Sequence, residues 1–262
     1  MKRIMNFCKA LFIVFCGFFL IINNHTTDVQ AASRMISLRE NKTYSGYDFT
    51  RNGKKDRFRC IRDTTRYGYV KLYLNGKFKQ RIFIGKGADL YWCGVGTKDT
   101  YLLVERHLYG GHELVAYMYS GGKFKEVPGR GNLNKVLSYP DFTKIQGNTL
   151  YVTSTPGSRN PSSFRNVTTP LKVQTKFKIK NKKISCLSWN SQVIGRRTFY
   201  ALTSFGTSKN VTKLNVKNGP KVNAGQKVTL NYIRLGGSNY IYQITVNGKT
   251  GWVANSTGVM FK

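Results

Sequence analysis

The sequence predicts an all-β protein. Short segments rich in β-branched and aromatic residues recur along the chain, and Gly or Asn bounds each of them, as is typical of strands joined by tight turns. Beyond the first 31 residues, no segment keeps apolar residues at helical spacing over about 12 positions. The predicted strands are residues 69–74, 101–104, 113–119, 149–153, 227–232 and 240–246.

A hairpin motif recurs in the first part of the chain. Tyr73-Leu-Asn-Gly-Lys-Phe-Lys-Gln80 returns 46 residues later as Tyr119-Ser-Gly-Gly-Lys-Phe-Lys-Glu126, and more weakly as Ile179-Lys-Asn-Lys-Lys-Ile-Ser185. The Asn-Gly and Gly-Gly pairs allow the positive φ of a tight hairpin turn. A period of about 40 to 50 residues is the spacing of propeller blades, but three units are too few to close an ordinary propeller. We therefore expect residues 32–187 to form a propeller-like or open β-repeat domain.

The N-terminus has the pattern of a secretory signal peptide. Lys2, Arg3 and Lys9 precede an apolar run over residues 10–22, and a polar stretch follows that ends at Ala31. The run is shorter than the ~20 residues of a membrane span, and small residues near position 31 suit a signal peptidase. We expect cleavage after residue 31, which leaves a secreted or wall-associated chain without a membrane span. An uncleaved anchor is the alternative.

The chain is strongly basic, and the charge is unevenly distributed. It has 43 Lys and Arg against 11 Asp and Glu, a formal net charge of +32, and 40% hydrophobic residues. That apolar fraction excludes a disordered polycation. The last acidic residue is Asp141, so residues 142–262 have no side-chain carboxylate to neutralise their cations. The excess cations either form a solvated surface that aids solubility or attract a polyanion. Because so many cations repel one another, the sequence favours the polyanion.

In one predicted strand, charged and apolar side chains lie on opposite faces. In residues 172–180, Val, Thr, Phe and Ile alternate with lysines, so the ammonium groups share one face. Two interpretations of the lysine face stay open. It is an ordinary solvated strand face, or an edge that lysines protect against aggregation; alternatively, it is an anion-binding strip. The residues expected to bind a polyanion are Lys172, Lys176, Lys178, Lys180, Lys182, Lys183, Arg196 and Arg197.

Residues 48–56 have the spacing of a calcium loop, with Gly53 at its sixth position. Its twelfth position is Arg59 instead of a bidentate carboxylate, and further cations lie within it. Two interpretations stay open: a weak Ca²⁺ site, or a turn whose side chains bind their own backbone, which the missing carboxylate favours. The candidate ligands are the side chains of Asp48, Thr50, Asn52 and Asp56 and the carbonyl of Lys54.

Several short motifs are similar to known β-repeat regions. They are the loop over residues 47–56, the hairpin at 75–77, the strand at 100–104 and the hairpin at 117–123. On these motifs, residues 34 to about 187 resemble the VCBS and FG-GAP-like regions of secreted proteins from Gram-positive bacteria. The resemblance implies adhesion or ligand display, a loop that binds calcium in some family members, and no named reaction.

The C-terminal part carries a second resemblance. Residues 214–220, 224–230 and 242–253, the last ending in Asn-Gly-Lys-Thr-Gly-Trp-Val, are similar to a bacterial SH3-like (SH3b) domain. The resemblance implies that residues 188–262 form a small SH3-like barrel with a ligand groove. Gly248 permits a hairpin turn, Gly251 allows close approach of two chains, and Trp252 is either a core filler or an aromatic platform. The groove residues expected on this basis are Tyr232, Tyr240, Tyr242 and Trp252.

Residues of catalytic type are few. His107 and His112 stand in His-Leu-Tyr-Gly-Gly-His, which is not the HExxH zinc motif, and the Gly-Gly pair predicts a loop tip instead of one helix face. Glu105 and Glu113 flank this segment as potential paired carboxylates, but any hairpin brings two acids together in this way. The sequence lacks a nucleophile elbow and a P-loop. We predict no enzymatic activity and no cofactor other than the Ca²⁺ alternative.

Three cysteines remain beyond the predicted signal peptide, Cys60, Cys93 and Cys186. An odd and sparse set argues against a disulfide framework. We interpret them as small buried hydrophobes, with one bridge and a spare thiol as the alternative.

A net charge of this size raises nucleic acid as a partner, but export and the lack of base-reading motifs argue against specific nucleic-acid binding. The phosphate-rich teichoic acids of Gram-positive walls fit both the expected location and the charge. We therefore predict a secreted, non-catalytic protein that anionic wall polymer or peptidoglycan retains through the basic C-terminal half. The alternatives are a cationic toxin or hydrolase accessory that acts on other cells, and a degenerate cell-wall hydrolase.

Overall fold

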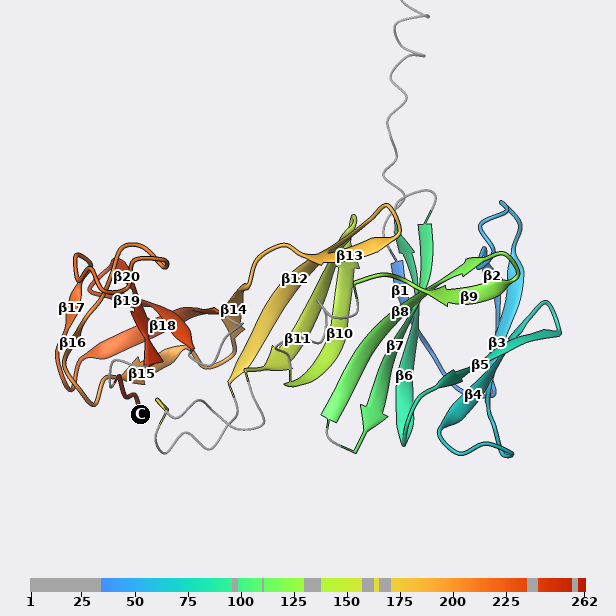
Figure 1. The fold of residues 1–262 in the computed structure, drawn as a ribbon, viewed down its shortest axis with the longest axis horizontal. Helices are drawn as coiled ribbons and strands as arrows, with labels where there is room; N and C mark the ends of the chain where they lie inside the picture. Colours follow the sequence, from blue (N-terminus) through green and yellow to red (C-terminus); the bar gives the residue numbers. More distant parts are fainter. Residues whose placement is uncertain are drawn as a thin grey trace, which may run out of the picture.

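The computed structural model describes residues 34–95, 99–109, 111–129, 138–156, 163–164, 171–234, 240–255 and 259–262. These residues form strands and no α-helix, which confirms the all-β prediction, and the sheets they build are open. The sheets follow one another along the long axis of the molecule (Figure 1). The predicted signal peptide, residues 1–31, lies outside the described residues. Within the described part of the chain, no helix has the length and hydropathy of a membrane span.

The first sheet is a four-stranded antiparallel meander in the order β2-β3-β4-β5. Alternation along β4 puts Val70, Leu72 and Leu74 on the buried face. These side chains pack with Phe58 of β3 against the second sheet. The strands are β2 (Thr43–Tyr47), β3 (Asp56–Arg62), β4 (Tyr69–Leu74) and β5 (Lys77–Phe83).

The second sheet is buried on both faces. Its order is β1-β6-β7-β8-β9. In β7, Leu102 and Val104 pack in the core shared with the first sheet, whereas Tyr101 and Leu103 pack in the core shared with the third sheet. This double burial explains why residues 101–104 are continuously apolar instead of alternating. The strands are β1 (Arg34–Leu38), β6 (Gly87–Val95), β7 (Asp99–Leu108), β8 (Gly111–Ser120) and β9 (Lys123–Glu126).

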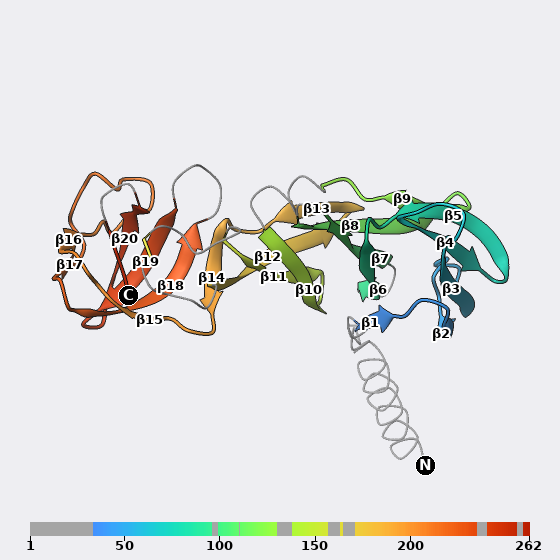
Figure 2. The same cartoon turned by 90° about the horizontal axis from the view of Figure 1, so that it is seen from below.

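The third sheet has nine strands and extends through the rest of the chain. Its path is β10-β11-β12-β14-β18-β19-β20, with β13 paired to β12 and β15 paired to β18. A separate two-stranded pair, β16 and β17, lies beside it (Figure 2). The strands are β10 (Ser138–Gln146), β11 (Thr149–Thr155), β12 (Lys172–Lys180), β13 (Lys183–Cys186), β14 (Asn190–Ile194), β15 (Thr198–Tyr200), β16 (Phe205–Gly206), β17 (Lys221–Val222), β18 (Lys227–Arg234), β19 (Ile241–Val246) and β20 (Lys249–Ala254).

The repeated hairpin occupies equivalent places in the three sheets. It connects β4 to β5, β8 to β9 and β12 to β13, the third and fourth strands of three successive meanders. The residues before and after the turn pair in each case: Tyr73 with Phe78, Tyr119 with Phe124, and Ile179 with Ile184. Both residues of each turn have positive φ, as the Asn and Gly pairs predict: Asn75 and Gly76, Gly121 and Gly122, Asn181 and Lys182.

Strand β12 is the junction of the nine-stranded sheet. Residues 172–174 pair with β14, whereas residues 177–180 pair with β13. Two different strands therefore follow one another along the same edge of β12. The chain passes from β13 to β14 through residues 187–189, and this passage contains the predicted domain boundary at residues 187 and 188. The core is continuous from the second sheet through this junction to the last strands.

The close chain approach predicted at Gly251 is present. A Cβ atom built on Gly251 would lie 2.6 Å from the Cβ of Thr207. Beside it, the backbones of Ser208 and Trp252 exchange two hydrogen bonds of 2.8 and 2.7 Å. The segment that precedes β17 is thereby fastened against β20.

Candidate functional site

A row of amide and aromatic side chains crosses the exposed face of the third sheet. The cross-strand register pairs Gln174 of β12 with Gln192 of β14, Gln192 with Tyr232 of β18, Tyr232 with Gln243 of β19, and Gln243 with Trp252 of β20. Directly paired residues share one face of a sheet, so these five side chains form one line. Four strand gaps of about 4.8 Å give the row a length of about 19 Å.

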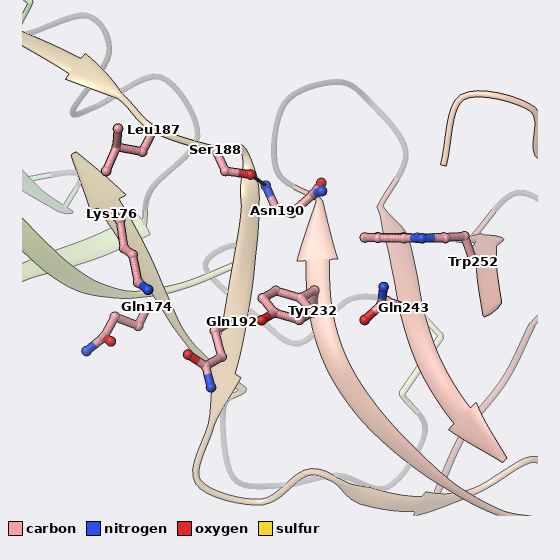
Figure 3. Close-up of a pocket in the computed structure, with 9 residues that line it drawn as sticks. All are labelled: Gln174, Lys176, Leu187, Ser188, Asn190, Gln192, Tyr232, Gln243 and Trp252. Carbon is pink, nitrogen blue, oxygen red and sulfur yellow. Dashed lines mark hydrogen bonds between the residues drawn. The ribbon is translucent and has the colours of Figure 1, made fainter. Parts of the chain in front are cut away.

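The row forms the floor of a groove with a volume of about 290 Å³. The groove lies beside the passage from β13 to β14, where the N–H of Leu187 donates a hydrogen bond of 2.9 Å to the carbonyl of Lys176 in the middle of β12. Tyr232 stands between Gln192 and Gln243 (Figure 3). The lining residues are Gln174, Lys176, Leu187, Ser188, Asn190, Gln192, Tyr232, Gln243 and Trp252.

One acceptor in the groove is unpaired. Asn190 Oδ1 is buried and has no hydrogen-bond partner among the described residues. Buried polar atoms are nearly always paired, so this amide oxygen is one of the few exceptions in the described part of the chain. Leu187 at the rim is 49% exposed and offers an apolar contact next to the amides.

Two of the four predicted groove aromatics line this groove and two do not. Tyr232 is 36% exposed, and Trp252 is mostly buried at 8% and reaches the groove from β20. Tyr240 donates a hydrogen bond to the carbonyl of Pro156 and is half-buried.

Tyr242 requires a correction, because its side chain is fully buried and belongs to the core. Its ring meets Phe164 edge-on at 5.6 Å, and its hydroxyl lies 3.2 Å from Ser163 Oγ. Burial raises the pKa of the Tyr242 phenol. The prediction of an exposed groove role failed here because alternation along β19 turns Gln243 outward and Tyr242 inward.

The predicted alternation of lysines along β12 is present, since residues 173, 175, 177 and 179 are buried. Lys176 lines the groove, and Lys178 lies on the same face. The remaining predicted polyanion ligands do not line the groove. Lys172 and Lys180 lie at the two ends of β12, Lys182 and Lys183 at the β12–β13 turn, and Arg196 and Arg197 between β14 and β15, all exposed.

A second basic feature extends the face beyond Lys176. The register pairs Lys176 with Tyr151 of β11 and Tyr151 with Lys144 of β10. The ammonium groups of Lys144 and Lys176 lie 4.7 and 5.6 Å from the Tyr151 ring centre. The exposed face of the sheet thus continues from the groove into a lysine-tyrosine-lysine row.

The predicted calcium loop is a network of internal hydrogen bonds. The Asp48 carboxylate accepts from the backbone N–H groups of Asn52 and Gly53, at 3.1 and 2.7 Å. The Asp56 carboxylate accepts from the backbone N–H of Thr50 at 2.8 Å and from its hydroxyl at 2.9 Å. Asn52 Oδ1 accepts from the backbone N–H of Lys54 at 2.8 Å. The carboxylates thus bind the loop's own backbone, which is the turn geometry of the second interpretation.

The two histidines meet across a hairpin. His107 of β7 pairs with His112 of β8, and their rings stack with centres 4.4 Å apart. His112 Nδ1 lies 2.6 Å from Glu105 Oε1, and His107 Nε2 lies 3.1 Å from Asp89 Oδ2. The prediction of a loop tip is corrected, because both histidines lie within strands. Glu113 is not part of the cluster, since it binds Arg106 at 3.1 Å.

Burial dominates the electrostatics of this cluster. Glu105 is 4% exposed, and its burial together with the neighbouring Asp141 raises the pKa of its carboxyl. Burial and the facing His107 lower the pKa of His112. The cluster thus favours an uncharged imidazole at His112.

The three cysteines are free. Cys60 and Cys93 are buried, and burial raises the pKa of each thiol to about 12. Cys186 is half-buried. None of them lies in the groove.

Comparisons of the chain with protein-family models, curated proteins and solved structures gave no match. The groove is therefore interpreted from its own chemistry. Sequence reasoning missed Gln174, Gln192 and Gln243, because isolated glutamines carry no local signal. It named Lys176, Tyr232 and Trp252, but for two separate sites, a basic strip and a groove, that the structure brings together.

Proposed function

We propose that this protein is a secreted, non-catalytic envelope protein that binds an anionic wall glycopolymer along the third sheet. The observation that carries the proposal is the row of Gln174, Gln192, Tyr232, Gln243 and Trp252, which leads into a groove that Lys176 also lines. The export signal and the envelope location enter from the sequence pattern of residues 1–31.

The amides suit a ligand rich in hydroxyl groups. A glutamine side chain offers two N–H donors and one acceptor, and a sugar hydroxyl offers one donor and two acceptors, so each group can serve the other. Tyr232 adds an exposed aromatic face against which the apolar face of a sugar ring packs.

The charge favours a polymer that carries phosphate. Residues 142–262 contain no side-chain carboxylate, so no acidic group of this part of the chain competes for Lys176. The Lys144–Tyr151–Lys176 row continues the basic surface past the groove, in the direction a long polymer needs. A teichoic-acid-like polymer combines alternating phosphates with sugars and polyols, which matches both features.

We also propose that the chain is divided into a β-repeat region and an SH3-like module. Three successive meanders with equivalent hairpins support a β-repeat region over residues 32–187 that serves as scaffold or adhesive module. The β18–β20 meander, closed at one side by the Ser208–Trp252 backbone pair, supports an SH3-like module over residues 188–262.

The test is sedimentation of the protein with purified Gram-positive walls, before and after extraction of teichoic acid, across a series of NaCl concentrations. The proposal predicts retention by intact walls, loss after extraction, and a steep decrease with salt. Undiminished, salt-insensitive binding to stripped walls would assign recognition to peptidoglycan and refute the polymer part. Absence of binding to either wall would refute the proposal as a whole.

Three variants distinguish binding in the groove from retention by net charge alone. Lys176→Gln and Lys54→Gln each remove one positive charge, but Lys54 lies in the exposed β2–β3 loop far from the groove. We expect Lys176→Gln and Tyr232→Thr each to weaken wall binding about tenfold, a loss of about 1.4 kcal/mol, and Lys54→Gln to leave it unchanged. Equal losses for Lys176→Gln and Lys54→Gln would mean that net charge alone retains the protein.

A further inference from the structure

The second sheet carries a cluster of nitrogen and oxygen ligands that the proposed wall binding does not use. Glu105, His107 and His112 offer one ligand atom each, and these atoms all lie within 4.8 Å of one another. A tetrahedral Zn²⁺ with ligand bonds of about 2.1 Å needs ligand atoms about 3.4 Å apart. The observed separations of 2.6 Å for Glu105–His112 and 3.8 Å for Glu105–His107 lie on either side of that value.

The strand register places the ligands on one face. Glu105 and His107 are two residues apart in β7, and His112 is the cross-strand partner of His107 in β8. Asp89 of β6 pairs with Glu105, and its Oδ2 atom lies 3.1 Å from His107 Nε2. Asp89 is therefore within reach of a fourth ligand position. Ligands on three hydrogen-bonded strands are held more rigidly than ligands on loops.

The backbone around His107 is also fixed. The carbonyl of His107 accepts a hydrogen bond of 2.8 Å from the N–H of Lys86. Gly85 has φ of 69° and lies so close to this carbonyl that a side chain there would collide with it. The segment before β6 thus clamps the main chain of one candidate ligand.

The ligand set selects a class of metal. Two imidazoles and a carboxylate suit Zn²⁺ and related first-row ions, whereas Ca²⁺ and Mg²⁺ prefer sites made of oxygen alone. Asp89 pairs with Glu105 across β6 and β7, so two carboxyl groups lie beside the imidazoles at the position a divalent cation would occupy. The side chains of His107 and His112 are 35% and 32% exposed, which leaves a route for the ion to enter.

We propose that Glu105, His107 and His112 form a binding site for a divalent transition-metal ion of the zinc class, with Asp89 as fourth ligand. The bound ion links β6, β7 and β8 next to the β10 strand. This inference is independent of wall binding, because the cluster lies on the second sheet and the groove lies on the third.

The experiment is isothermal titration of the untagged, chelator-treated protein with Zn²⁺, together with visible absorption after addition of Co²⁺. The expected result is one saturable site per chain, intense Co²⁺ bands typical of tetrahedral coordination, a raised Tm with Zn²⁺, and no competition from excess Ca²⁺ or Mg²⁺. We expect His107→Gln and His112→Gln each to weaken Zn²⁺ binding by at least the 10- to 100-fold that changes around a metal ligand typically cost.

Glu113→Gln is the matched control, since it changes a carboxylate of the same hairpin that binds Arg106 and lies outside the cluster. It should retain Zn²⁺ affinity and the Co²⁺ spectrum. Circular dichroism of each metal-free variant checks that it is folded, and the double variant His107→Gln, His112→Gln identifies any binding by other groups. The proposal is overturned if the wild-type protein shows no saturable site, or if the folded double variant binds Zn²⁺ as tightly as wild type.

Discussion

Substituting Tyr242 and Tyr232 one at a time tests whether Tyr242 belongs to the core and Tyr232 to the groove. Tyr242 is 0% exposed, and its ring packs against Phe164 and Phe261. Truncation of a buried aromatic side chain to Ala typically costs about 3–5 kcal/mol, a large part of the 5–15 kcal/mol that stabilises a domain. Tyr242→Phe keeps the ring and removes only the hydroxyl contact to Ser163, so it should cost about 0.5–1.5 kcal/mol.

Tyr232 should behave in the opposite way. It is 36% exposed and lies on the groove face, and Thr, like Tyr, favours strands, so Tyr232→Thr should change the unfolding free energy by about 0.5 kcal/mol or less. Wall binding should fall about tenfold, as proposed above.

The assay is urea unfolding followed by tryptophan fluorescence, with wall sedimentation of each folded variant. Tyr242→Ala should lower the unfolding midpoint strongly, and Tyr242→Phe should lower it slightly while wall binding stays at the wild-type level. Loss of wall binding in Tyr242→Phe at an unchanged midpoint would refute the placement of Tyr242 in the core. A destabilised Tyr232→Thr with normal binding would refute the groove.

Two further predictions concern close packing and pH. Gly251→Ala forces a Cβ atom against Thr207, which is fully buried and whose hydroxyl donates to the Pro220 carbonyl at 2.7 Å, so we expect a loss of about 1–3 kcal/mol in urea unfolding. An unchanged midpoint would contradict this packing. The buried carboxylate of Asp63 accepts hydrogen bonds from Thr65 and pairs with Arg81 and Lys71, and these contacts lower its pKa. Its contribution to stability is present above the unfolded pKa of about 3.9 and is lost on further acidification. The Tm of Asp63→Asn should therefore be below that of wild type at pH 7, and the difference should narrow below about pH 4; a constant difference would argue against the ion pairs.

Local pattern predicted seven of the 20 strands that the described residues form. Residues 69–74 form β4, and the other five predicted strands lie within β7, β8, β11, β18 and β19 to within one residue. The turns were predictable because Asn75-Gly76 and Gly121-Gly122 adopt the positive φ that their residue types allow. Alternation along residues 172–180 likewise predicted which side chains of β12 are buried.

Pairing between distant strands was not predictable. Gln174, Gln192 and Gln243 come together only because β14 inserts between β12 and β18, and no residue near these positions encodes that neighbour. The histidine cluster was not predicted from the sequence for a different reason. A hairpin between His107 and His112 pairs the two rings and places Glu105 on the same face, but the sequence interpretation applied the hairpin only to Glu105 and Glu113 and assigned the histidines to the loop tip.

The distribution of acidic residues assigns different roles to the sheets. In the first two sheets and their loops, carboxylates meet cations or histidines: Glu40 with Arg62, Asp63 with Arg81, Asp99 with Arg51, and Glu105 with His112. Beyond Asp141 no acidic side chain exists, so the positive charge of the remaining sheet has no internal partner of that kind. A protein selected only for solubility would gain from interspersing both signs over its surface. The one-sided arrangement costs self-repulsion that only salt or a bound polyanion reduces. Wall retention and its salt dependence are therefore the measurements on which the proposed function depends.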